Sequence, residues 1–148
     1  MVWALAAWEL YAATGDTAWL RTAHDVTRRS ALADLHAARD ARTGLFHGES
    51  SFLDWREQSY PRWMQPADIY RSQSLGTNAI HHGAYRVLAR MARALREPDA
   101  EARRWDAIAD SVAAGMAAHQ NCRSSRALTV PLLIPATASS REGHPGPA

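Results

Sequence analysis

Residues 44–64, GLFHGESSFLDWREQSYPRWM, separate two helical blocks and show no sustained helical period of their own. Three carboxylates, two arginines, a histidine and two tryptophans are gathered in this one segment. Pro61, and Pro66 just beyond it, exclude a continuous helix here. Connections of this length are usually functional or disordered, and disordered segments are poor in aromatic residues. The sequence therefore predicts an ordered loop, continuing to about residue 74, that forms the mouth of a site.

Helical patterns flank this loop in two pairs, at residues 2–14 and 17–38 before it and at residues 75–96 and 100–118 after it. The first pattern is apolar on nearly all sides, which predicts a helix buried on several sides, whereas the second is amphipathic. Gly15 is suited to end the first helix, and Asp16 is suited to cap the N-terminus of the second. Pro98 separates the two helices of the second pair. The sequence predicts an all-α fold of two αα-hairpins, with a short strand as an option within residues 45–52.

The composition changes abruptly after residue 120. Residues 121–148 are rich in Pro, Ser, Gly and Thr and show no helical period. We therefore expect a helical domain over residues 1–120 and an irregular or disordered tail over residues 121–148. The change also suggests a fragment with an atypical or frame-shifted end.

Composition argues against several classes of partner. All 17 basic residues are arginines, and they are interleaved with acids, so no basic stripe for nucleic acid is expected. No apolar run reaches the length of a membrane span. The single cysteine, Cys122, excludes an internal disulfide and a cysteine metal cluster. There is no metal-ligand spacing and no Gly-rich phosphate loop, so neither metal nor cofactor is expected, and the compartment stays undetermined.

Two segments resemble six-hairpin glycosidases, the (α/α)6 toroid enzymes. Ser51-Phe52-Leu53-Asp54-Trp55 resembles the Ser-x-Leu-Asp segment of processing α-glucosidases. Glu49-Ser50 followed by Asp54 is similar to the Glu-Ser-Gly-Trp-Asp segment of trehalases, with one residue of extra spacing. The resemblance is strongest over residues 44–73 and does not extend past residue 121.

This resemblance implies a fold and a function. The first and third helices would be inner helices of the toroid, the second and fourth outer ones, and the long loop would enter at the N-terminal end of an inner helix. Two hairpins are a third of such a toroid, so the chain would be a fragment of a glycoside hydrolase acting on an oligo- or polysaccharide. Independent activity is in question, and the uncovered core faces would favour self-association.

Glycoside hydrolysis requires a protonated carboxylic acid at the glycosidic oxygen and a second carboxylate. Asp54 is the candidate acid, because desolvation by Phe52 and Trp55 would raise its pKa. The alternative is a structural carboxylate paired with Arg56 or Arg62. The identity of the second carboxylate stays open among its sequence neighbours Glu49, Glu57 and Asp68.

Other polar and aromatic residues of the loop, with one histidine of the third helix, are candidates for binding substrate. Guanidinium and carboxylate groups suit sugar hydroxyls, and aromatic rings suit a pyranose face, although a structural ion pair or an anchor in the core is the alternative for several of them. The set is Glu49, Trp55, Arg56, Glu57, Tyr60, Trp63, Asp68 and His81.

A helical-repeat scaffold of tetratricopeptide type is the competing interpretation, since its helix pairs have similar patterns. Such a module would bind without catalysis and would bury its own helix faces. Other toroid enzymes, such as sugar epimerases, share the expected fold. A partial toroid should instead leave apolar faces of the first and third helices uncovered.

Overall fold

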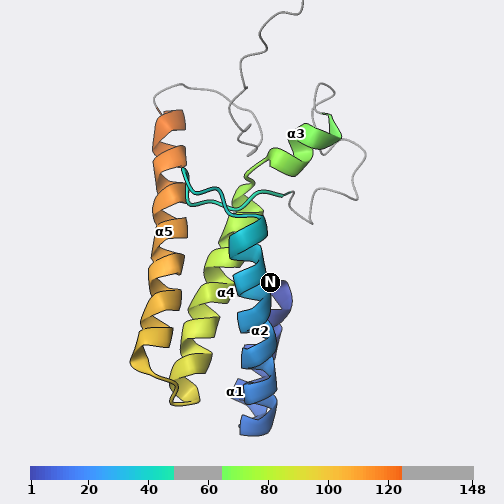
Figure 1. The fold of residues 1–148 in the computed structure, drawn as a ribbon, viewed down its shortest axis with the longest axis vertical. Helices are drawn as coiled ribbons and strands as arrows, with labels where there is room; N and C mark the ends of the chain where they lie inside the picture. The colour runs from blue at the N-terminus through green and yellow to red at the C-terminus, as the bar shows by residue number, and fades with distance from the viewer. Residues whose placement is uncertain (49–64, 125–148) are drawn as a thin grey trace, which may run out of the picture.

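The computed structural model describes residues 1–48 and 65–124, and the regular structure in these ranges is helical (Figure 1). The helices are α1 (Val2–Thr14), α2 (Thr17–Ala37), α3 (Pro66–Arg71), α4 (Leu75–Ala94) and α5 (Asp99–Ser124). The predicted all-α class and its two hairpins, α1–α2 and α4–α5, are confirmed. The short strand considered for residues 45–52 is represented, as far as residue 48, by isolated bridges of Phe46 with Arg39 and of Gly48 with Gln73.

The first hairpin turns within two residues. Gly15 adopts a left-handed conformation with φ of 68°, and its N–H donates to the Tyr11 carbonyl at 2.7 Å. The Asp16 carboxylate then accepts from the N–H groups of Ala18 and Trp19 at 2.9 and 3.0 Å, which caps α2. The turn and its cap are those expected from the sequence.

Three helices differ from the sequence prediction by two residues or more. α3 was expected to be loop, but Pro66 occupies the first position of a helix, where its missing N–H costs nothing. α4 ends at Ala94, two residues early, before Arg96 at φ 57°. α5 extends to Ser124 because no proline or glycine interrupts it after residue 118. Of the irregular tail expected over residues 121–148, residues 121–124 belong to α5, and residues 125–148 lie outside the described residues.

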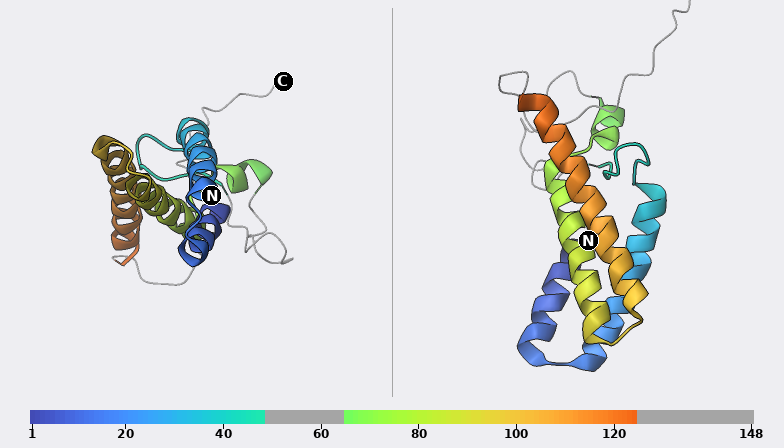
Figure 2. Two further views of the ribbon diagram at one scale, coloured as in Figure 1. Left: turned by 90° about the horizontal axis from the view of Figure 1, so that it is seen from below. Right: turned by 90° about the vertical axis from the view of Figure 1, so that its left-hand side faces the viewer.

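α4 is the central helix of the molecule (Figure 2). It packs against α1, α2 and α5, whereas α2 and α5 do not approach each other closely. One core cluster lies between α4 and α5, with Tyr85 and Leu88 against Trp105 and Val112, and a second joins Val87 and Met91 to α1 and α2. The contact of α1 with α4 is the one expected of neighbouring inner helices.

α1 is less covered than its apolar sequence predicted. Ala4 and Ala7 are buried, and the Ala7 carbonyl accepts from the Trp19 indole N–H of α2 at 3.2 Å. Val2, Trp3 and Leu10 remain 55, 38 and 48% exposed. The uncovered face expected of a partial toroid is therefore present on α1. It is not present on α4, which α5 and the loop base cover.

At Gly115 the turn after α2 lies against α5. A Cβ at this position would meet the Thr43 carbonyl oxygen at 2.6 Å and the Leu45 Cδ2 at 3.0 Å. We expect Gly115→Ala to reduce the free energy of unfolding by about 1–3 kcal/mol, because the backbone of Thr43 must move. Urea denaturation followed by circular dichroism measures the change.

Gly83→Ala is the matched control. The added Cβ would meet only Leu5 Cδ2 at 3.5 Å, an ordinary contact. This variant should therefore gain up to about 1 kcal/mol from helix propensity. Equal effects of the two substitutions would show that the close approach at Gly115 is unimportant.

Candidate functional site

The two described flanks of the long loop meet at the N-terminal end of α4. The Gly48 N–H donates to the Ser72 carbonyl at 2.9 Å, and the Gly48 carbonyl accepts from the Thr77 hydroxyl at 3.4 Å. Gly48 also bridges to Gln73 in a parallel sense. The chain between residues 48 and 65 therefore leaves from and returns to the same end of the helical hairpins, opposite their short turns (Figure 1).

The Asn78 side chain binds the backbone of Phe46, in the segment before the long loop. Its carboxamide oxygen accepts from the Phe46 N–H at 2.7 Å, and its NH₂ group donates to the Phe46 carbonyl at 3.1 Å and to the Ser74 carbonyl at 2.9 Å. The side chain is 1% exposed. Residues 38–40 pair with this segment on one side, and the Asn78 side chain takes the place of a second strand on the other.

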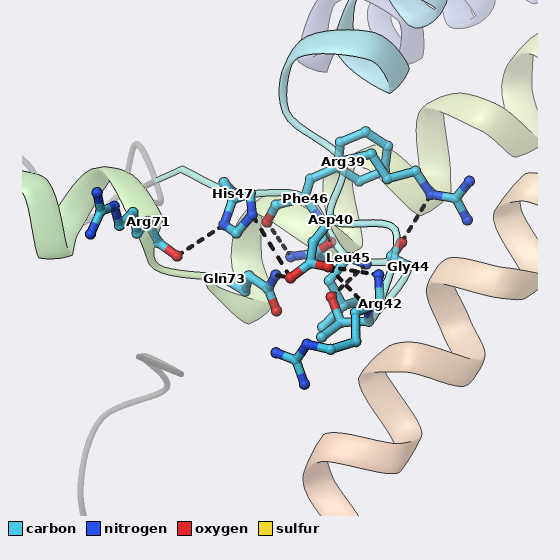
Figure 3. Close-up of polar contacts among 11 residues, drawn as sticks. Arg39, Asp40, Arg42, Gly44, Leu45, Phe46, His47, Arg71 and Gln73 are labelled. Atoms are coloured by element: carbon cyan, nitrogen blue, oxygen red, sulfur yellow. Dashed lines mark hydrogen bonds and ion pairs between the residues drawn. The ribbon is translucent and has the colours of Figure 1, made fainter. Parts of the chain in front are cut away.

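Asp40 joins the two flanks through its carboxylate (Figure 3). One oxygen accepts from the N–H groups of Arg42 and Thr43 at 2.7 and 3.3 Å, and the other accepts from the Gln73 carboxamide at 3.1 Å. Burial raises the pKa of this carboxyl, but these hydrogen bonds to its charged form outweigh burial and leave the pKa below its usual range. Asp40 is therefore an ionised structural group.

His47 lies beside this carboxylate and points between the two flanks (Figure 3). Its Nδ1 is 2.9 Å from the Arg71 carbonyl oxygen, which can only accept, so Nδ1 carries the proton. Its Nε2 is 3.9 Å from the Asp40 carboxylate. The sequence offered a signal for Asp40, since an aspartate four residues before a left-handed glycine is typical of a turn. Nothing in the sequence paired it with Gln73.

His81, a predicted substrate-binding residue, lies under the loop base. Its ring stacks on Phe46 with centroids 3.9 Å apart and planes 1° apart. The residue is 9% exposed, and burial lowers its pKa to about 4. Its Nδ1 has no hydrogen-bond partner in the described ranges. A neutral, buried imidazole supports the base of the loop.

Asp68, the other described candidate, lies in the first turn of α3. Its carboxylate accepts from the Gln65 N–H at 3.0 Å, which is the arrangement of a third helical residue capping its own helix. The remaining candidates, Asp54 included, lie outside the described residues: Glu49, Asp54, Trp55, Arg56, Glu57, Tyr60 and Trp63. Over residues 1–48 and 65–124, no helix is long and apolar enough to cross a membrane. No group of three potential metal ligands was found in those ranges.

Burial of His81 should make stability depend on pH. The unfolded state binds a proton near pH 6.5, but the folded state does so only near pH 4. The free energy of unfolding should therefore fall by on the order of 2 kcal/mol as pH drops through this window and be fully retained above it. Urea titrations at pH 7.5 and 4.5 measure the difference.

His81→Phe should keep the stack on Phe46 and lose much of this pH dependence; part remains because burial also lowers the pKa of His24. His36→Phe removes an imidazole from the exposed surface of α2 and serves as the control. A pH dependence unchanged by His81→Phe would contradict the assignment.

Comparison with known proteins places this geometry in a family. Residues 1–130 match the model of the bacterial alpha-L-rhamnosidase 6 hairpin glycosidase domain. Searches of curated proteins and of solved structures gave no significant match. The family is named for α-L-rhamnosidase, whereas the motifs of residues 49–55 resembled those of glucosidases and trehalases. The six-hairpin prediction is confirmed, and no finding favours a tetratricopeptide scaffold. The match covers most of the chain, which therefore belongs to the bacterial α-L-rhamnosidase six-hairpin glycosidase family, a family of glycoside hydrolases.

Proposed function

We propose that the chain supplies one part of an active site that hydrolyses α-L-rhamnosides, with Asp54 as the general acid. One observation carries the proposal: both flanks of residues 49–64 are anchored at the N-terminal end of α4. The segment that contains Asp54 therefore begins, and after α3 ends, beside an inner helix. The family name supplies the sugar class.

Asp54 would protonate the glycosidic oxygen as the bond to the leaving group breaks. A second carboxylate must then activate water or attack the sugar. Among the carboxylates near Asp54 in the sequence, Asp68 is the least suitable for this second role, because it already accepts a hydrogen bond from the Gln65 N–H. Glu49 and Glu57 are therefore the better candidates within this chain, and another hairpin of the toroid is the alternative source.

The remaining loop residues would bind the sugar. We assign Trp55, Tyr60 and Trp63 to stacking on the pyranose ring, and Arg56 and Glu57 to its hydroxyl groups. His81 would act indirectly, by supporting Phe46 at the base of the loop, because it is buried beneath that ring.

Asp54→Asn tests the role of the acid. Loss of a general acid typically costs 10²–10⁴-fold in rate, and the cost is greatest for a poor leaving group. We expect a small loss with p-nitrophenyl α-L-rhamnoside and a loss of at least about 100-fold with an alkyl rhamnoside. Rates are measured on the chain, alone and within a complete six-hairpin domain.

Asp68→Asn is the matched control, since it removes a carboxylate that caps α3, and it should retain most activity. Equal losses for the two leaving groups in Asp54→Asn would assign this residue to a role other than the acid. Full activity in that variant would remove it from the mechanism.

We further propose that the uncovered face of α1 packs against the same face of a second copy of the chain. The described residues form two hairpins, whereas the family builds six, and inner helices of a toroid lie side by side. Trp3, Val2 and Leu10 provide an apolar surface of the kind such a contact buries.

Sedimentation velocity over a range of concentrations tests this contact. The chain should form dimers, and Trp3→Ser combined with Leu10→Ser should weaken dimerisation at least tenfold. Val26→Ser, which removes an apolar side chain 36% exposed on α2, should leave it intact. A wild-type chain that stays monomeric at every concentration would contradict the proposal.

A further inference from the structure

A groove of about 650 Å³ lies at the end of the molecule opposite the candidate site. Arg21, His24 and Arg28 of α2 form one side, and Glu101 and Arg104 of α5 form the other. The turn between α4 and α5 closes the bottom. Because α4 has 20 residues, its length separates the groove from the loop base by about 30 Å.

The charged groups of the groove leave one positive charge in excess once the ion pair of Asp25 is counted. The Asp25 carboxylate pairs with Arg29 at 3.0 Å, and the Glu101 carboxylate accepts from the Trp105 indole N–H at 2.8 Å. The three arginines that line the groove, Arg21, Arg28 and Arg104, have no ion pair within the described ranges. Against these three guanidinium groups stand the carboxylates of Glu97 and Glu101, because a hydrogen bond from a neutral indole leaves the charge of Glu101 in place.

His24, which lines the groove, has an unsatisfied polar atom. The residue is 7% exposed, and its Nε2 is buried without a hydrogen-bond partner in the described part of the chain. Buried polar groups are normally paired, because an unpaired one loses the energy of its contact with water. Burial also lowers the pKa of this imidazole, so at neutral pH it is uncharged and can offer Nε2 as a donor in one tautomer.

The arginines line the groove from two helices. Arg21 and Arg28 are seven residues apart on α2, which is about two helical turns and therefore the same face, with His24 between them. Arg104 approaches from α5 across the groove. Guanidinium groups match the planar or tetrahedral oxygens of carboxylate and phosphate with two parallel hydrogen bonds.

We propose that this groove binds the oxyanion group, carboxylate or phosphate, of a small ligand, held between Arg28 and Arg104 with His24 at the floor. The site is separate from the loop base and does not depend on the proposed hydrolysis. It would recognise either a free inorganic anion or an acidic sugar.

Proton NMR of the intact chain tests the proposal with inorganic phosphate, glucuronate and glucose, at constant ionic strength. The His24 imidazole signal is identified by its loss in His24→Gln. We expect saturable shifts of this signal with at least one of the two anions and none with glucose. Saturation by phosphate alone indicates a free anion as ligand, and saturation by glucuronate alone indicates an acidic sugar.

Arg28→Gln and Arg104→Gln should each weaken anion binding at least tenfold. Arg90→Gln removes the same charge from the exposed surface of α4 and should change the dissociation constant less than twofold. Circular dichroism confirms folding, and if one groove variant fails to fold, the other decides.

Three results would overturn the proposal: no saturable shift with either anion, an equal response to glucose, or an equal loss of binding in Arg90→Gln.

Discussion

The Asn78 carboxamide holds the backbone of Phe46 in both directions, and the base of the long loop depends on that pair of hydrogen bonds. On one side the segment from Leu45 to His47 pairs with residues 38–40, where the Leu45 carbonyl accepts from the Asp40 N–H and the His47 N–H donates to the Ala38 carbonyl, both at 2.8 Å. The N–H and C=O groups of the buried Phe46 have no strand on their own side and need another partner. A single side chain of α4 provides it for Phe46 at 2.7 and 3.1 Å. The Phe46 ring can then enter the core and stack on His81.

A second set of contacts ties the same segment to α5. The Arg39 guanidinium donates to the Gly44 carbonyl at 3.2 Å and to the Ser111 hydroxyl at 2.6 Å. Thr43 lies so close to Gly115 that no side chain fits between them. The turn after α2 therefore belongs structurally to the second hairpin (Figure 1). Because α4 and α5 both hold it, the N-terminal end of α4 is the rigid part of the candidate site.

The two ends of the hairpins have different chemistry. At the loop end, the described polar side chains of Asn78, Asp40 and Asp68 are occupied by backbone groups, which makes them a support for the loop. At the turn end, arginines face a groove without ion-pair partners among the described residues. A fold whose helices are held by apolar packing along their length leaves both ends free for binding.

The sequence by itself determined the helices, their caps and the family. Gly15, Asp16 and Pro98 act on the residues beside them, so their effects can be predicted from local chemistry alone. The motif around Asp54 was recognisable for the same reason, although its residues lie outside the described ranges. Three features were decided only by the folded structure. They are the burial of His81 under Phe46, the pairing of Asp40 with Gln73 and the capping role of Asp68.

These contacts are tertiary or depend on a helix that the sequence did not predict. Phe46 and Asn78 are 32 residues apart, and Asp40 and Gln73 are 33 apart. No local propensity encodes such a pairing, because it forms only when α2, α4 and α5 have packed together. α1 shows the reverse: its sequence is apolar on nearly every side, but the packing of the described helices buries only Ala4 and Ala7 and partly covers Leu5, Trp8 and Tyr11.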